Sequence, residues 1–169
     1  MGKDWTSESL ERWSTFDSRL EAGSAEVIER IGRIALQLSR WQDEVFGRYG
    51  LNRGEVGVLY ALGAAGPPHR LSPTQLSRVL MLTSAGVTNR LDRLERRGLV
   101  VRHPDPGDRR GVVVELTEPG SQIAQQAVGA AAEGQAALLA GLSAQEARTL
   151  GRLLRKMQSG LDGVAPPSP

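Results

Sequence analysis

The spacing of apolar residues changes abruptly near Gly98, and this change limits the fold more than any other feature of the sequence. Before Gly98 the apolar residues recur every three or four positions, as on one face of a helix. After it, residues 99–102 and 111–116 have the character of two short strands, the second β-branched and alternating. The segment DPGDRR between them is rich in turn-forming residues. We therefore expect helices that end at Gly98, followed directly by a β-hairpin.

The first of two short helices expected before Gly98 has clear end signals. Ser72 stands as its N-cap, Pro73 occupies the first helical position, and Gln75 completes a capping box. Its buried face is expected to comprise three apolar residues, Leu76, Val79 and Leu80. Another helix, from about residue 52 to residue 64, is predicted ahead of it and is closed by Gly66 and two prolines.

The second short helix is longer and richer in arginine. Thr83 or Ser84 is its N-cap, and its inward residues are Val87, Leu91 and Leu94. Two short helices separated by a turn of about three residues form a helix-turn-helix. A helix-turn-helix followed at once by a hairpin is a winged helix, in which the hairpin tip lies beside a DNA duplex. This position accounts for the charged tip DRR.

Long amphipathic helices are predicted on both sides of this unit. Residues 24–50 form a long helix with a heptad-like seam of apolar residues, Val27, Ile31, Ile34, Leu38, Trp41 and Val45. A shorter amphipathic helix, which includes Trp13, precedes it. On the C-terminal side, a helix rich in alanine and glycine begins after Thr117, and a last helix opens with the capping box of Ser143 and Glu146. Leucines up to Leu161 form a second seam.

The expected fold class is therefore mainly α with a small β wing. We expect N-terminal helices over residues 1–50, a winged helix-turn-helix over 51–117, C-terminal dimerisation helices over 118–161 and a disordered tail over 162–169. The two apolar seams have little of their own domain to cover them, so the simplest arrangement is a homodimer with interlocked ends. The alternative is that the terminal helices pack only on their own domain.

Charge and composition favour an anionic partner and disfavour several kinds of site. The net charge is only +2, but residues 69–110 hold nine arginines against four acidic residues, a local balance of +5. The chain has no cysteine and two histidines, which argues against a disulfide, a thiolate nucleophile or a metal site. We find no set of catalytic residues, so we expect neither an enzyme nor a cofactor. No secretory segment or long apolar stretch is present, which predicts a cytoplasmic protein with no membrane partner.

The chain resembles the MarR family of bacterial winged-helix regulators in three places. These are the helix-turn-helix SPTQLSRVLMLTSAGVTNRLDRLERRGLV, the wing DRRGVVVELTEPG with its Asp-x-Arg and Leu-Thr-x-x-Gly patterns, and the long helices at both ends. Together they span roughly residues 24–161. The resemblance implies a homodimeric transcription factor, usually a repressor, that binds a palindromic operator in double-stranded DNA. Its recognition helix enters the major groove, and its wing reaches the minor groove.

Carried over to this sequence, the resemblance assigns DNA-binding residues on two elements. The recognition helix would present short side chains to the groove, namely Ser84, Ala85, Thr88 and Asn89. In the wing, Arg110 would enter the minor groove with Asp108 as its brace, and Arg109 would contact the phosphate backbone. Five other arginines are each expected to clamp a phosphate or to pair with a neighbouring acid: Arg53, Arg78, Arg93, Arg96 and Arg97.

The segment from GPPHRLSPTQ to RLDRLE, together with the additional N-terminal helix, is similar to the urate-responsive branch of the family. In that branch a tryptophan, an aspartate and two arginines form the ligand network. Arg90 and Arg102 match the arginines, and Trp13, or else Trp5, matches the tryptophan. The aspartate position falls on Gly57, so the resemblance implies an anionic effector without specifying it. The alternative for both arginines is contact with phosphates or with neighbouring acids alone.

Two further functions compete with an effector-controlled repressor. A protein-interaction adaptor would keep the winged helix but not bind DNA, and an acidic recognition face or loss of the wing arginines would have favoured it. The other alternative is a protein that keeps both the winged helix and DNA binding but responds to no ligand. The salt dependence of binding to duplex DNA separates the adaptor from the other two.

Overall fold

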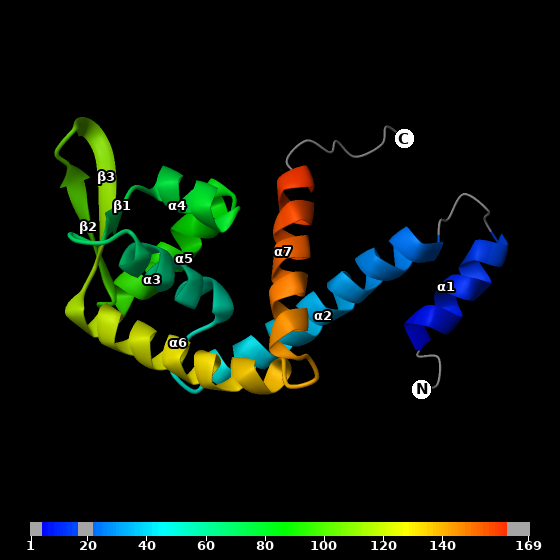
Figure 1. The fold of residues 1–169 in the computed structure, drawn as a ribbon. Helices are drawn as coiled ribbons and strands as arrows, with labels where there is room; N and C mark the ends of the chain where they lie inside the picture. The colour runs from blue at the N-terminus through cyan, green and yellow to red at the C-terminus, as the bar shows by residue number, and fades with distance from the viewer. Residues whose placement is uncertain (1–4, 17–21, 162–169) are drawn as a thin grey trace. The chain divides into compact units, whose positions relative to one another are not determined.

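The computed structural model describes residues 5–16 and 22–161. The described helices are α1 (Trp5–Phe16), α2 (Ala22–Gly47), α3 (Arg53–Ala64), α4 (Pro73–Leu80), α5 (Ser84–Arg96), α6 (Glu118–Leu138) and α7 (Ala144–Leu161). The strands are β1 (Arg70–Leu71), β2 (Val100–Asp105) and β3 (Asp108–Leu116), in the order β1-β3-β2 with antiparallel neighbours. The predicted class, mainly α with a small β wing, is confirmed (Figure 1). The predicted tail over residues 162–169 lies outside the described residues.

Residues from α3, α4, α5 and the sheet form one closely packed core. Leu59 and Leu62 of α3, Leu76 of α4, Leu91 of α5 and Val114 of β3 are all fully buried or nearly so. These helices lie against the sheet, and both outer strands of the sheet pair with β3 (Figure 1). The buried residues recur at the helical spacing that the sequence indicated, so the amphipathic pattern positions α5 against the domain.

Capping residues fix the ends of these helices as the sequence predicted. Ser72 and Gln75 form the capping box of α4 with Pro73 at its start, and Thr83 rather than Ser84 is the N-cap of α5. Asn52 forms a similar capping box with Glu55 at the start of α3. These reciprocal bonds satisfy backbone N–H groups that a helix leaves free at its first turn.

One residue expected in the core is instead on the surface. Val79 is 60% exposed, whereas Leu76 of the same helix is fully buried. Because α4 has only eight residues, its buried stripe is narrow and centres on Leu76. The prediction of Val79 as a core residue was therefore wrong.

The hairpin is longer than the sequence indicated. The first strand was predicted to end at Arg102, yet β2 continues through Pro104 to Asp105. Since β2 is an outer strand of the sheet, a residue without an N–H group is tolerated there. The two-residue strand β1, which was not predicted, pairs with the other side of β3 through Arg70 and Leu71.

The Leu-Thr-x-x-Gly pattern joins the hairpin to α6. The Thr117 hydroxyl donates a hydrogen bond to the Gly98 carbonyl and accepts one from the Gly120 N–H, at 2.8 and 3.1 Å. The Gly120 backbone lies so close to the Leu99 carbonyl that an added Cβ would collide with it. The threonine and the glycine thus fix where α6 begins relative to the end of α5.

The helices at the two ends of the chain are less enclosed. The chain divides into two compact units, residues 1–128 and 129–169. In the first unit, α1 packs against α2. In the second, α7 has no buried residue, and Ser143 and Glu146 form the capping box that was predicted for it. Among the described helices, none is long and apolar enough to cross a membrane.

Candidate nucleic-acid interface

Helix α5 presents four different surfaces around its axis. Val87, Leu91 and Leu94 face the core and are buried. At about 100° per residue, Ala85 and Asn89 fall opposite this buried stripe. One side of the helix carries Gly86, Arg90 and Arg97, and the other carries Ser84, Thr88, Asp92 and Glu95. The outermost surface is therefore short and polar, with arginines only toward its C-terminal end.

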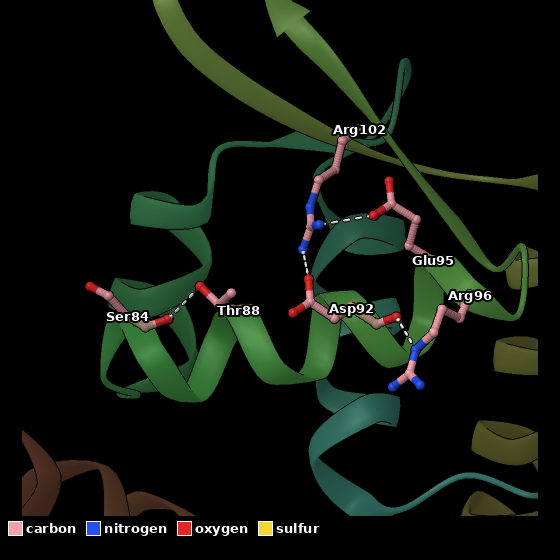
Figure 2. A network of polar contacts seen from close by, with 6 residues as sticks. All are labelled: Ser84, Thr88, Asp92, Glu95, Arg96 and Arg102. Carbon is pink, nitrogen blue, oxygen red and sulfur yellow. Dashed lines mark hydrogen bonds and ion pairs between the residues drawn. The ribbon is translucent and has the colours of Figure 1, made fainter.

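The four residues assigned to the major groove, and Arg93 beside them, all lie on the exposed part of this helix. Ser84, Ala85, Thr88, Asn89 and Arg93 are each exposed. The Thr88 hydroxyl donates to the Ser84 carbonyl at 3.0 Å (Figure 2). Within the described part of the chain, the side chains of Asn89 and Arg93 make no polar contact. These two side chains are free to bond an external partner.

The turn before α5 is held by local contacts. Met81 adopts a left-handed conformation with φ of 51°, which reverses the chain at the end of α4. The Ser77 hydroxyl donates to the Leu82 carbonyl, and the Thr83 hydroxyl accepts the Gly86 N–H at 3.2 Å. The start of α5 is thus fixed relative to α4.

The wing contains an irregular step at the arginine pair. Pro104 pairs with Val112, but the next residue, Asp105, pairs with Asp108, so residues 109–111 oppose a single step of β2. Such a bulge bends a strand and redirects its side chains. The Asp105 carboxylate also accepts the Gly107 N–H at 2.8 Å at the turn. The side chains of Arg109 and Arg110 lie outside what the structure describes, and Asp108 is exposed.

Arg102 is engaged by acids of α5. Its Nη1 lies 2.8 Å from the Glu95 carboxylate and its Nη2 lies 2.7 Å from the Asp92 carboxylate (Figure 2). Arg96 donates to the backbone carbonyl of Asp92 at 3.1 Å. The strand β2 is thus joined to α5 by ion pairs near the middle of the helix.

Arg97 and Arg90 connect the opposite side of α5 to the N-terminal half of the chain. The Arg97 guanidinium donates to the Gly50 carbonyl at 2.6 Å, just after α2. Arg90 donates to the Gly86 carbonyl at 2.8 Å, and its guanidinium lies over Gly54 of α3, where any Cβ would collide with it. Both arginines have structural contacts that hold α5 in place.

A third ion pair lies on the sheet. Arg70 of β1 binds Glu115 of β3 at 2.7 Å, and His103 Nε2 of β2 lies 2.9 Å from the same carboxylate, without a well-aligned hydrogen bond. The hydrogen bond from Arg70 holds the pKa of the Glu115 carboxyl below its usual value of 4.5, although desolvation of the carboxyl opposes this shift. The charge of Arg70 lowers the pKa further. This carboxylate therefore joins all three strands.

The contacts separate the described arginine side chains of the winged domain into two groups. The first group contacts other elements or its own helix, and comprises Arg70, Arg90, Arg96, Arg97 and Arg102. Arg53, Arg78 and Arg93 are exposed, and no polar partner of their side chains lies among the described residues. Sequence spacing did not separate the two groups, because the partners of Arg70, Arg97 and Arg102 lie on other elements.

The three residues suggested for an effector lie on different elements. Trp13 is on α1 and 59% exposed, Arg90 is on α5, and Arg102 is on β2. Gly57, at the position of the missing acid, faces the Leu80 side chain at ordinary contact distance. Of the two arginines, only Arg102 has carboxylate partners among the described side chains.

Comparison with known proteins covers the same elements. A family model described as MarR family matches residues 49–111. Over 155 residues the chain is 32% identical to the HTH-type transcriptional regulator PecS of Dickeya dadantii. The aligned residues make up 92% of this chain and 93% of that protein.

Two solved structures extend the likeness to the fold. A mutant MarR from E. coli complexed with operator DNA is 30% identical with a TM-score of 0.65, over 77% of this chain and 94% of that chain. A MarR family transcriptional regulator from Streptomyces coelicolor is 25% identical with a TM-score of 0.73, over 85% of this chain and 99% of that chain. The first of these bears a duplex, so its fold is compatible with DNA binding.

Proposed function

This chain belongs to the MarR family of winged-helix transcriptional regulators, and we propose that it represses transcription by binding a palindromic operator as a homodimer. The single observation that carries the DNA-binding surface is the free outer face of α5. Asn89 and Arg93 are exposed there without an internal polar partner among the described residues. An asparagine amide suits the edge of adenine, and an arginine suits guanine or a phosphate.

Phosphate contacts fall to the arginines that the fold does not use. Arg53 is at the first turn of α3 and Arg78 is in the last turn of α4, and both are exposed. Together with Arg93 they supply positive charge on three helices of the winged domain. Such contacts position a protein on the duplex without reading its sequence.

The wing is proposed to reach the minor groove. Arg110 would enter the groove, Asp108 would brace it, and Arg109 would contact the backbone. The bulge at residues 109–111 supports this assignment, because it sets the arginine pair apart from the regular ladder of the hairpin. Arg110→Ala is expected to weaken specific binding at least tenfold and to leave dimerisation intact. Normal binding by this variant would reduce the tip to a charged turn.

The effector site is proposed to use Arg90 rather than both arginines. Arg102 is already neutralised by two carboxylates, whereas among the described residues Arg90 has only a backbone carbonyl as its polar partner. With Gly57 in place of an acid, no carboxylate at that position would repel an anionic ligand. Trp13 of α1 is retained as the aromatic candidate. If urate or another aromatic anion raises the thermal midpoint, Arg90→Ala should abolish that rise, and an unchanged rise would remove this site.

Salt dependence tests DNA binding against the adaptor. With six or more phosphates neutralised by a dimer, affinity for a duplex from the region flanking its gene should fall about a thousandfold or more between about 50 and 200 mM salt. A flat response, or no binding at either salt concentration, would support an adaptor that recognises proteins instead.

A further inference from the structure

The contact between the wing and the recognition helix is made by three charged side chains. Arg102 of β2 spans the two acids of α5, with Nη1 on Glu95 at 2.8 Å and Nη2 on Asp92 at 2.7 Å (Figure 2). Each acid takes a different end of one guanidinium. Because that group is planar and rigid, both distances are constrained together.

The backbone of Arg102 is fixed by the sheet. Arg102 pairs with Val114, which is fully buried, so both side chains lie on the side of the sheet that the helices cover. Asp92 and Glu95 are three residues apart on α5 and therefore lie about one turn apart. A contact at two points along the helix axis restrains rotation of α5 against the hairpin as well as its distance.

The ion pairs of Arg102 contribute little to folding stability, so another role must explain them. The side chain of Arg102 is 29% exposed, Glu95 is 37% exposed and Asp92 is 49% exposed. Ion pairs this accessible to water contribute little to folding. The acids are also costly on a surface that approaches phosphates, since they repel the duplex. Their presence is explained if they hold something else in place.

We propose that Arg102, Asp92 and Glu95 form a clamp that sets the angle between the wing and the recognition helix, so that both reach their grooves at the same time. Arg102 is a positioning residue in this role, acting through the two acids. The inference rests on the proposed DNA-binding function and adds the residues that align its two reading elements.

Removing the acids separates positioning from electrostatics. The double variant Asp92→Asn with Glu95→Gln removes both ion pairs of Arg102, leaves at most neutral hydrogen bonds in their place, and removes two negative charges from each protomer. Simple electrostatics, or an Arg102 that binds phosphate, predicts tighter binding to every duplex. The clamp predicts at least tenfold weaker binding to the operator and equal or tighter binding to a scrambled duplex of the same length.

The experiment measures both affinities at one salt concentration near 0.15 M for the wild type and four variants. Three of them are the double variant, Arg102→Met, and the triple variant that combines these changes. The fourth is a control for net charge, Glu44→Gln with Glu133→Gln, which alters exposed acids on α2 and α6. The clamp predicts that the triple variant loses no more operator affinity than Arg102→Met, since one contact cannot be broken twice. The control should keep its preference for the operator.

Arg102→Lys provides a second test that conserves charge. A lysine ammonium cannot span two carboxylates as the guanidinium does, so part of the operator preference should be lost. Thermal unfolding of each variant checks that the fold persists. Tighter operator binding by the double variant, or losses that add in the triple variant, would overturn the clamp. If the wild type bound neither duplex, the proposed function would fail instead.

Discussion

The winged domain and the C-terminal helix bury their leucines to very different extents. Leu59 and Leu62 in the core of the winged domain are fully buried, whereas Leu153 and Leu154 of α7 are 45% and 42% exposed. All four are on amphipathic helices. The difference shows that the first region completes its core within one chain, while the second presents an apolar seam that its own unit does not cover.

The glycines show the same contrast at the scale of one methyl group. At Gly120, where α6 leaves the winged domain, an added Cβ would collide with the Leu99 backbone. At Gly129, about two and a half turns further along the same helix, no atom of the described residues beyond the local helix backbone lies within 4 Å of an added Cβ. The helix thus passes from a filled environment to an open one along its length.

Helix α2 shows the same contrast within the first unit. Val45 and Phe46 at its C-terminal end are buried, while Val27 and Ile34 of the apolar seam, nearer its start, are exposed. An exposed seam on a long helix favours association with another helix. We infer that a second copy of the chain covers the open seams, as the proposed homodimer requires.

The largest expected effect is on self-association, from a charge placed in the exposed apolar seam of α7. Leu154→Asp places a carboxylate where the partner subunit would bury an apolar side chain, so self-association should weaken on the order of a hundredfold or more. Ser159→Asp adds the same charge at an exposed polar position on the opposite face of α7 and serves as the matched control. Sedimentation over a range of concentrations measures both. Equal association by wild type and Leu154→Asp would mean that α7 is not in the interface.

The next largest effect is on folding stability, at the point where α6 leaves the winged domain. Gly120→Ala forces a methyl group against the Leu99 carbonyl, and we expect a loss of about 1–3 kcal/mol in the free energy of unfolding. Gly63→Ala is its control, because a Cβ there meets only the Leu116 side chain at 3.9 Å. That substitution should gain about 0.5–1 kcal/mol from lower chain entropy in the unfolded state. Urea denaturation of both variants compares them, and a benign Gly120→Ala would contradict the tight junction.

The smallest effect is from the ion pair within the sheet. Arg70 lowers the pKa of Glu115 in the folded state below 4.5, so the ionised form stabilises the fold above about pH 4.5. This contribution is lost as the pH falls through the lowered pKa. The stability advantage of wild type over Glu115→Gln should therefore shrink between about pH 5 and pH 3. Urea midpoints across this range measure it, and a difference independent of pH would argue against the pair.

Local signals in the sequence predicted much of the fold. Ser72, Gln75 and Thr83 act on backbone groups within three residues of themselves, so the starts of α4 and α5 were legible from the chain alone. Strand β1 was not, because two residues have no measurable period and it exists only by pairing with β3. The continuation of β2 through Pro104 depended on its being an outer strand, which is a property of the sheet.

The site was predictable in part for the same reason. The exposure of Ala85 and Asn89 follows from helical periodicity once Val87 and Leu91 are known to be inward. The roles of Arg97 and Arg102 do not follow from periodicity. Arg97 bonds a backbone carbonyl that comes after α2, and Arg102 of β2 pairs with acids of α5. Sequence spacing reports contacts within a helix, and the arginines that bind across the fold are found only when the elements are placed.

The most direct test of the account is the footprint of the wild-type protein on the region flanking its gene, together with the number of protomers bound. Two copies per site, protecting two inverted half-sites about one helical turn apart, are predicted by a dimer whose winged domains are complete and whose seams meet. A single protected half-site with one protomer would contradict it.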